Sequence, residues 1–184
     1  MSLAALSKFS SLVDRFIDKL GQVTAWFSLL MVLMTTIIVI LRYGFGMGWI
    51  AMQESVIYMH AAVFMLGIAY TLKHDEHVRV DIFYQKFSAK NRAWVDLLGT
   101  LFILLPVCGF IFYFSLDYVV RSWRILEDSG EAGGIPAVFI LKTLIIVMPI
   151  LLGLQGIATA IKQLLTIVDF DTDLKQDEQS QEQN

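Results

Sequence analysis

An uncharged stretch of 18 residues, Ser55–Leu72, lies between Glu54 and the polar segment that begins at Lys73. At about 1.5 Å per residue, a helix over this stretch is about 27 Å long, close to the hydrocarbon thickness of a bilayer. A soluble helix of that length would carry a polar face, but the few polar residues here do not share one face. The stretch therefore predicts a membrane-spanning helix that ends in a polar loop.

The rest of the chain repeats this pattern. Hydrophobic residues make up 57% of the 184 residues, above the share in soluble domains, and the mean hydropathy is +0.65. Uncharged stretches predict spans at about residues 22–42, 55–72, 97–116 and 140–161. Pro106 predicts a kink in the third span. We therefore predict an all-α integral membrane protein with four transmembrane helices in a membrane domain of residues 20–165.

The two ends of the chain have different compositions. In residues 1–20, apolar side chains recur every three or four positions and charged ones fall between them, which predicts an amphipathic helix in the membrane interface. Gly21 is a predicted bend between this helix and the first span. Residues 166–184 are acidic and rich in glutamine, which predicts a disordered tail.

The distribution of basic residues predicts the orientation. Ten of the 14 Lys and Arg residues lie on the side of the termini and of the loop 73–96, and four lie on the other side. Since basic residues are enriched in cytoplasmic segments, both termini are predicted to be cytoplasmic. A net charge of −3 gives no indication of nucleic-acid binding.

Few side chains in the spans suit chemistry. His60 is the one histidine within a span, whereas a haem-binding helix bundle normally supplies two axial ligands. We interpret His60 as a neutral imidazole that is hydrogen-bonded across helices, and a membrane anchor for a redox enzyme remains the alternative function. The polar loop carries His74 and His77, but their spacing matches no known zinc pattern. Cys108 is the one cysteine, so the chain forms no internal disulfide. No catalytic, cofactor-binding or metal residue is predicted.

The spans instead favour a role in packing. Their central parts lack charged residues, which mark ion and substrate paths in membranes, so a stand-alone transporter is disfavoured. Gly153 and Gly156 lie on one face of the fourth span, where small residues allow another helix to approach closely. That helix belongs either to a partner subunit or to this chain's own bundle.

Aromatic, glycine and charged residues at fixed spacings run from the end of the first span into the polar loop: Arg42-Tyr43-x-Phe45, Trp49, Glu54, Tyr58, Gly67 and His77-Val-Arg-Val-Asp81. This pattern resembles the small membrane subunit, of DctQ type, of tripartite ATP-independent periplasmic (TRAP) transporters. The later segments Glu131–Pro136 and Leu141–Thr143 are similar to a branch of the family that carries organic acids or related solutes.

The resemblance implies a function without catalysis. The chain is expected to be a small scaffold subunit that braces a large, elevator-type membrane subunit of DctM type in the bacterial inner membrane. Import of an organic acid or related solute would be driven by sodium, which is expected to bind the large subunit and not this chain. A periplasmic binding protein would deliver the solute.

The resemblance also assigns candidate residues. Arg42 and Glu54 would fix the outer ends of the first two spans, either as a pair or by contact with the binding protein. The loop motif would order the cytoplasmic loop through backbone, lipid phosphate or the large subunit. Candidates for structural or partner contacts are Arg42, Trp49, Glu54, Tyr58, His77, Arg79, Asp81, Gly153 and Gly156. Candidates for docking of the binding protein are Arg121, Arg124, Glu127 and Asp128, and candidates for lipid headgroup contacts are Lys73, Arg79 and Arg92.

Overall fold

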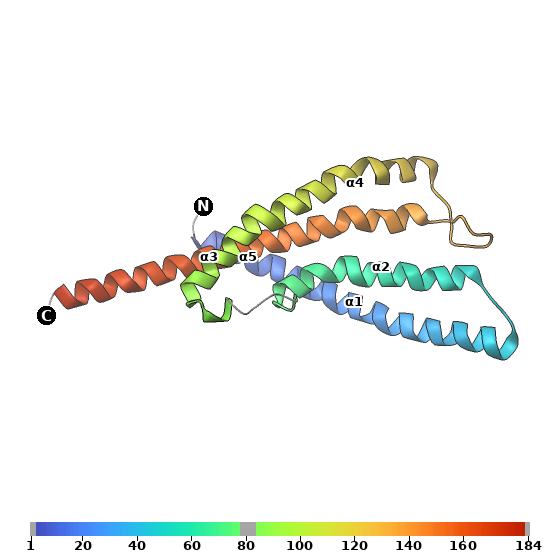
Figure 1. The fold of residues 1–184 in the computed structure, drawn as a ribbon, viewed down its shortest axis with the longest axis horizontal. Helices are drawn as coiled ribbons and strands as arrows, with labels where there is room; N and C mark the ends of the chain where they lie inside the picture. Colours follow the sequence, from blue (N-terminus) through green and yellow to red (C-terminus); the bar gives the residue numbers. More distant parts are fainter. Residues whose placement is uncertain (1–2, 78–83, 183–184) are drawn as a thin grey trace.

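The computed structural model describes residues 3–77 and 84–182, and every regular element in them is a helix (Figure 1). In chain order the elements are α1 (Leu3–Phe45), α2 (Ile50–Lys73), η1 (Tyr84–Lys86), α3 (Ala89–Gly99), η2 (Thr100–Leu104), α4 (Leu105–Ile125) and α5 (Val138–Glu182). Because α3, η2 and α4 are continuous, the described residues contain four helices long and apolar enough to cross a membrane. The predicted all-α fold with four spans is confirmed.

The helices form a bundle with two different ends. The terminal end holds the start of α1, residues 74–77 and 84–88, and the C-terminal part of α5, which projects beyond the other helices (Figure 1). The loop end holds residues 46–49, between α1 and α2, and residues 126–137, between α4 and α5. These two names are used below.

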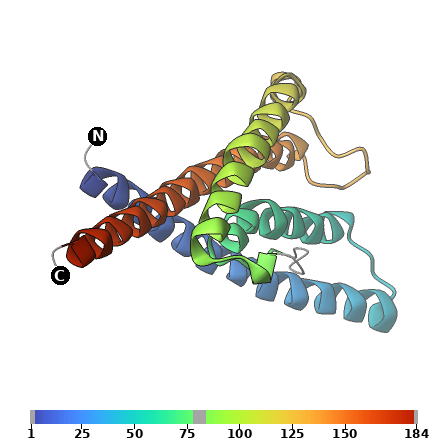
Figure 2. The same cartoon turned by 60° about the vertical axis from the view of Figure 1, so that its left-hand side comes forward.

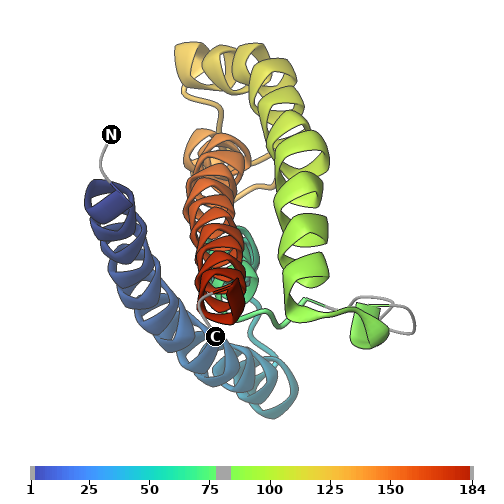
Figure 3. The same cartoon turned by 90° about the vertical axis from the view of Figure 1, so that its left-hand side faces the viewer.

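The last span, α5, lies at the centre of the packing. It contacts α1, α2, α3 and α4, and α4 packs against α5 on the side away from α1 (Figure 3). Towards the terminal end α5 crosses α1, as Figure 2 shows. One buried cluster there combines side chains of α1, α2 and α5, and a second combines α3 and α5; the members are Val13, Ile17, Ala69, Leu151 and Ala158, and Ala93, Leu97, Ala160 and Ile167.

Most apolar side chains of the other spans point outward. Trp26 on α1 is 67% exposed, and Phe102 and Phe110 on the third span are 74% and 61% exposed. Such surfaces need a bilayer or another protein to cover them, because a soluble monomer rarely exposes apolar patches of this extent. The distribution fits a helix bundle embedded in lipid.

The amphipathic segment and the first span form one helix. α1 is continuous from Leu3 to Phe45, so no break separates the two segments at Gly21, and the helix curves along its length (Figure 3). Gly21 has a packing role, because a Cβ at this position would collide with the ring of Tyr70 on α2.

The third span contains an irregular turn where a kink is expected. Residues Thr100–Leu104 form a π-helical turn, η2, directly before Pro106. Proline lacks the N–H that an α-helix needs and crowds the preceding turn, so the helix widens at this point.

Two segments expected to lack regular structure are helical. α4 continues to Ile125, so the loop expected from Asp117 is shorter by about two turns. α5 continues to Glu182, through the tail for which disorder was expected. Extending an existing helix requires no new nucleation, and Glu, Gln and Lys are good helix formers.

Candidate functional site

Glu54, near the start of α2, accepts hydrogen bonds from the loop between α4 and α5. A side-chain contact that holds two elements together in this way is called a tie below. The Glu54 carboxylate accepts hydrogen bonds from the Ser129 hydroxyl and from the backbone N–H of Ile135, the latter at 2.5 Å. A Cβ at Gly134 would collide with both Ser129 and Glu54, so the approach requires a glycine there. The neighbouring Gly133 has a φ of +82°, which glycine adopts without strain.

The structure does not bring the proposed partner of Glu54 to it. Arg42 lies exposed in the last turn of α1 and forms no ion pair with the described residues. The carboxylate of Glu54 is occupied by Ser129 and Ile135 instead. The sequence located Glu54 but not these partners, which follow it by 75 and 81 positions.

Glu127 forms a second tie at the loop end. Lys142 on α5 donates a hydrogen bond to the Glu127 carboxylate at 2.5 Å, and its Nζ lies 4.2 Å from the centroid of the Tyr118 ring on α4. The backbone carbonyl of Glu127 accepts the N–H of Val138 at 3.1 Å. The ammonium of Lys142 lowers the pKa of the Glu127 carboxyl below its usual value.

This pKa shift predicts acid sensitivity of the tie. A lowered pKa in the folded state means that the contact stabilises the fold above the ordinary carboxyl value of 4.5 and is lost as pH falls through the lower, folded-state value. Replacing Lys142 by methionine is therefore expected to lower the unfolding midpoint at neutral pH, with the deficit shrinking on acidification. The unfolding midpoints of the detergent-solubilised protein and of the variant are measured over a range of pH values. Arg124→Met, which removes an exposed cation that forms no ion pair within residues 3–77 and 84–182, should give a deficit that does not vary with pH in this way. A constant deficit for Lys142→Met would contradict the assignment.

The four predicted docking residues have different surroundings. Arg121 pairs with Asp117 one turn earlier on α4, at 2.5 Å, and both side chains are mostly exposed. Arg124 and Asp128 lie exposed and form no ion pair within residues 3–77 and 84–182. Glu127 is directed to Lys142. Of the four docking candidates, Arg121, Arg124 and Asp128 are therefore the ones whose side chains are accessible to another protein at the loop end.

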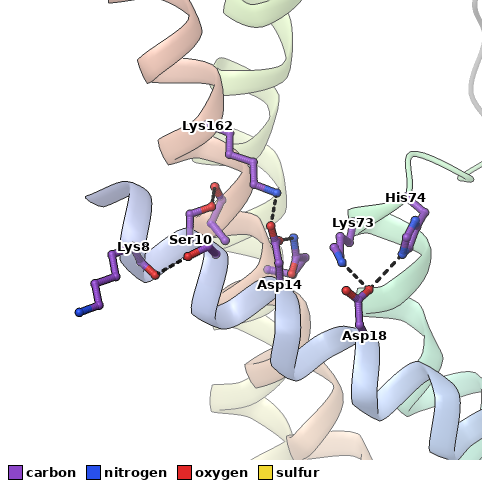
Figure 4. Close-up of polar contacts among 10 residues, drawn as sticks. Lys8, Ser10, Asp14, Asp18, Lys73, His74 and Lys162 are labelled. Carbon is purple, nitrogen blue, oxygen red and sulfur yellow. Dashed lines mark hydrogen bonds and ion pairs between the residues drawn. The ribbon is translucent and has the colours of Figure 1, made fainter. Parts of the chain in front are cut away.

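At the terminal end two acids of α1 contact two other helices, as Figure 4 shows. Asp18 forms an ion pair with Lys73 at the end of α2 and lies 3.2 Å from Nε2 of His74. One turn earlier, Asp14 pairs with Lys162 of α5 at 2.5 Å. The sequence analysis missed these contacts, although acids at positions i and i+4 in an amphipathic helix mark one polar stripe.

Two further hydrogen bonds join α1 to α5 near the Asp14–Lys162 pair. Gln155 is fully buried, and its side-chain nitrogen donates to Asp14 at 3.2 Å. The Ser10 hydroxyl donates to the backbone carbonyl of Ala158 at 3.2 Å. The start of α1 is therefore held on α5 by side-chain hydrogen bonds as well as by apolar packing.

The two glycines of α5 pack within the chain's own bundle. A Cβ at Gly156 would meet Leu104 of η2 and would lie 3.5 Å from Cγ2 of Thr100, and a Cβ at Gly153 would lie 3.8 Å from that of Cys108. Of the two possibilities for this stripe, the structure favours the internal one.

The remaining candidates lie apart from one another. Trp49 is 65% exposed before α2, and Tyr58 has a buried hydroxyl without a hydrogen-bond partner among the described residues. His77 is exposed and lines a groove of about 530 Å³ between α1 and α2, together with Gly67. Arg79 and Asp81 lie outside the described residues.

Two of the three candidates for lipid contact, Lys73 and Arg92, have partners in the chain, and the third, Arg79, lies outside the described residues. Lys73 is 14% exposed and engaged by Asp18. Arg92 donates from Nε to the carbonyl of Phe87 at 3.1 Å and lies over the ring of Tyr84.

His60 lies on the surface of α2. Its ring contacts Phe64 at a centroid distance of 5.5 Å, and it makes no hydrogen bond to another helix within the part of the chain that the structure describes. The cross-helix hydrogen bond expected for it is therefore absent there. The same described residues contain no group of three or more His, Cys, Asp and Glu side chains able to hold a metal ion.

Comparison with known proteins gives a consistent result. Residues 31–166 match the family described as tripartite ATP-independent periplasmic transporters, DctQ component. The chain is also 28% identical over 156 residues to the ectoine TRAP transporter small permease protein TeaB of Halomonas elongata, an alignment that covers 83% of this chain and 78% of that protein. No solved structure matches the chain.

The matched range begins within the first span and ends beyond the fourth predicted span, so it includes part of the first span, the other three spans and both loop-end ties. The chain therefore belongs to the DctQ family: it is a multi-pass membrane subunit of a TRAP transporter and not an enzyme, and its partners are a large DctM-type subunit and a periplasmic binding protein.

Proposed function

We propose that this subunit is a rigid scaffold that braces the large membrane subunit during sodium-driven import of an organic acid or related solute. The observation that carries the proposal is the set of ties at both ends of the bundle. Glu54 and Lys142 fasten the loop end, and Asp14 and Asp18 fasten the terminal end. A helix bundle fixed at both ends resists the relative movements that a transporting subunit needs.

The absence of charge from the span interiors supports the same function. Residues 22–41, 55–72, 97–116 and 143–161 contain no Asp, Glu, Lys or Arg. Intramembrane charges mark ion and substrate paths because they are costly to insert. We infer that sodium and solute bind the large subunit.

The orientation and the solute class belong to this proposal. The excess of Lys and Arg at the terminal end supports cytoplasmic termini in the bacterial inner membrane, with the loop end facing the periplasm. The relative from Halomonas elongata is named for ectoine, which supports a small polar organic solute. In this orientation Arg124 and Asp128, which are exposed at the loop end, would face the periplasm, where we expect them to meet the binding protein.

A reconstitution experiment tests the proposal. The chain is co-purified with the large subunit and inserted into liposomes, the binding protein is added with candidate organic acids, and a sodium gradient is applied. Uptake should require all three proteins and the gradient. Unchanged uptake without this chain would refute the scaffold function, and unchanged uptake without sodium would refute the coupling. In the same assay, charge reversal at Arg124 and Asp128 should weaken docking of the binding protein if this surface meets it.

A further inference from the structure

The first half of α1 has a buried side and an outward side. Ser10, Val13 and Ile17 are almost fully buried against the other helices. On the outward side, Phe9, Leu12 and Phe16 are 40%, 65% and 53% exposed. The apolar residues of this amphipathic segment therefore serve two surfaces, one within the bundle and one facing away from it.

The charges of this segment are sorted by sign. Both acids turn towards neighbouring helices, where Asp14 pairs with Lys162 and Asp18 pairs with Lys73 (Figure 4). The three cations, Lys8, Arg15 and Lys19, are exposed and form no ion pair with the described residues. Figure 4 shows Lys8 pointing away from α5. Among the described side chains, no acid compensates the positive charge of the outward side.

The cations and the exposed apolar residues form two adjacent stripes. At about 100° per residue, Lys8, Arg15 and Lys19 fall within a sector of about 40°, and Phe9, Leu12 and Phe16 fall within the next 60° or so. The apolar stripe continues along the same helix into the exposed Val23 of the spanning part. A surface of this kind places its apolar stripe in the acyl region and its cations at the headgroups.

We propose that this outward side of α1, defined by Lys8, Arg15 and Lys19 with Phe9, Leu12 and Phe16, binds anionic phospholipids at the terminal end of the bundle. The cations extend over 11 positions, or about 16 Å of helix, which suits several headgroups better than one compact ligand. An acidic protein would be attracted by the same charges. The exposed apolar stripe beside them is continuous with the lipid-facing span, and this favours lipid.

The ion pairs of the two acids are what create this surface. If Asp14 and Asp18 faced outward, they would compensate two of the three cations. Because they are paired with Lys162 and Lys73 instead, the attraction to anionic headgroups is not cancelled. The inference does not depend on which solute is transported.

The test uses the full-length chain in nanodiscs made from equal parts of phosphatidylglycerol and phosphatidylcholine. Lipids retained after release into mild detergent are counted by native mass spectrometry. The variant Lys8→Gln/Arg15→Gln/Lys19→Gln should lose its preference for phosphatidylglycerol, by about fivefold for each cation removed. The swapped variant Lys8→Arg/Arg15→Lys/Lys19→Arg should keep it.

A matched control removes the same charge at the other end of the bundle, through Arg42→Gln/Arg121→Gln/Arg124→Gln. This control should keep most of the preference. Equal losses in the two triple variants would overturn the proposal, since the attraction would then be one of net charge. Unchanged phosphatidylglycerol retention in the first variant would also overturn it. If that variant instead lost co-purification with the large subunit, the surface would belong to the protein interface.

Discussion

Replacing Gly156 by valine is expected to loosen α4 from α5 and to lower the free energy of unfolding by about 1–3 kcal/mol, the usual cost of overpacking a well-packed interior. Gly156 is buried, and an added Cβ would meet Leu104 and approach Thr100 and Leu105 within 3.6 Å. Valine adds two more carbon atoms, which must displace η2. Detergent unfolding followed by circular dichroism measures the loss.

Gly153 provides the matched control three residues away on the same helix. A Cβ there would make ordinary contacts at 3.8 Å to Cys108 and 3.9 Å to Leu105. Gly153→Ala should therefore leave the unfolding midpoint unchanged or raise it slightly, because alanine is the better helix former. If Gly156→Val and Gly153→Ala lowered the free energy of unfolding equally, the face of α5 that carries the two glycines would not pack against η2 and α4 as described.

The second large effect is expected at Glu54. Replacing it by alanine removes both acceptors that hold the loop 126–137, so the backbone N–H of Ile135 loses its partner. Hydrogen exchange in that loop should accelerate by about tenfold or more, since exchange follows the free energy of local opening. Glu54→Gln keeps one acceptor oxygen and should give a smaller acceleration. Hydrogen–deuterium exchange mass spectrometry of the protein in nanodiscs measures the exchange rate of the loop in both variants.

Asp128 serves as the control for this experiment. It lies exposed in the same loop, so Asp128→Asn changes the same charge without removing a tie. It should leave the exchange of Ile135 unchanged. If Glu54→Ala also left that exchange unchanged, the loop would be held by Glu127 and Lys142 alone, and the tie from α2 would have no energetic role.

The spanning helices were predictable because length and hydropathy act locally. A helix needs about 20 apolar residues to span a bilayer, so each uncharged stretch of about this length predicts a spanning helix. Helix ends were less predictable. The ends of α4 and α5 continue past charged residues because those residues are good helix formers, and hydropathy alone carries no signal for a helix that leaves the apolar region.

The ties at the two ends depend on the tertiary arrangement. The sequence identified Glu54 as a candidate through its position at the start of a span. Its partners, Ser129 and Ile135, lie in the loop between α4 and α5, far from Glu54 in the sequence. The pairing of Asp14 with Lys162 likewise needs α1 to cross α5. The interfacial helix was inferred from its apolar spacing, yet its acids turn inward because Lys73 at the end of α2 and Lys162 within α5 lie within reach.

The central position of α5 has a consequence for biosynthesis. Of the four spanning helices α5 leaves the ribosome last, yet Ser10 and Asp14 find their partners on it, 148 and 141 residues later. At about 5–20 residues per second, that separation corresponds to a delay of about 7–30 s. During this interval α1 lies in the bilayer without its polar partners, and other membrane components have access to the side that α5 later covers.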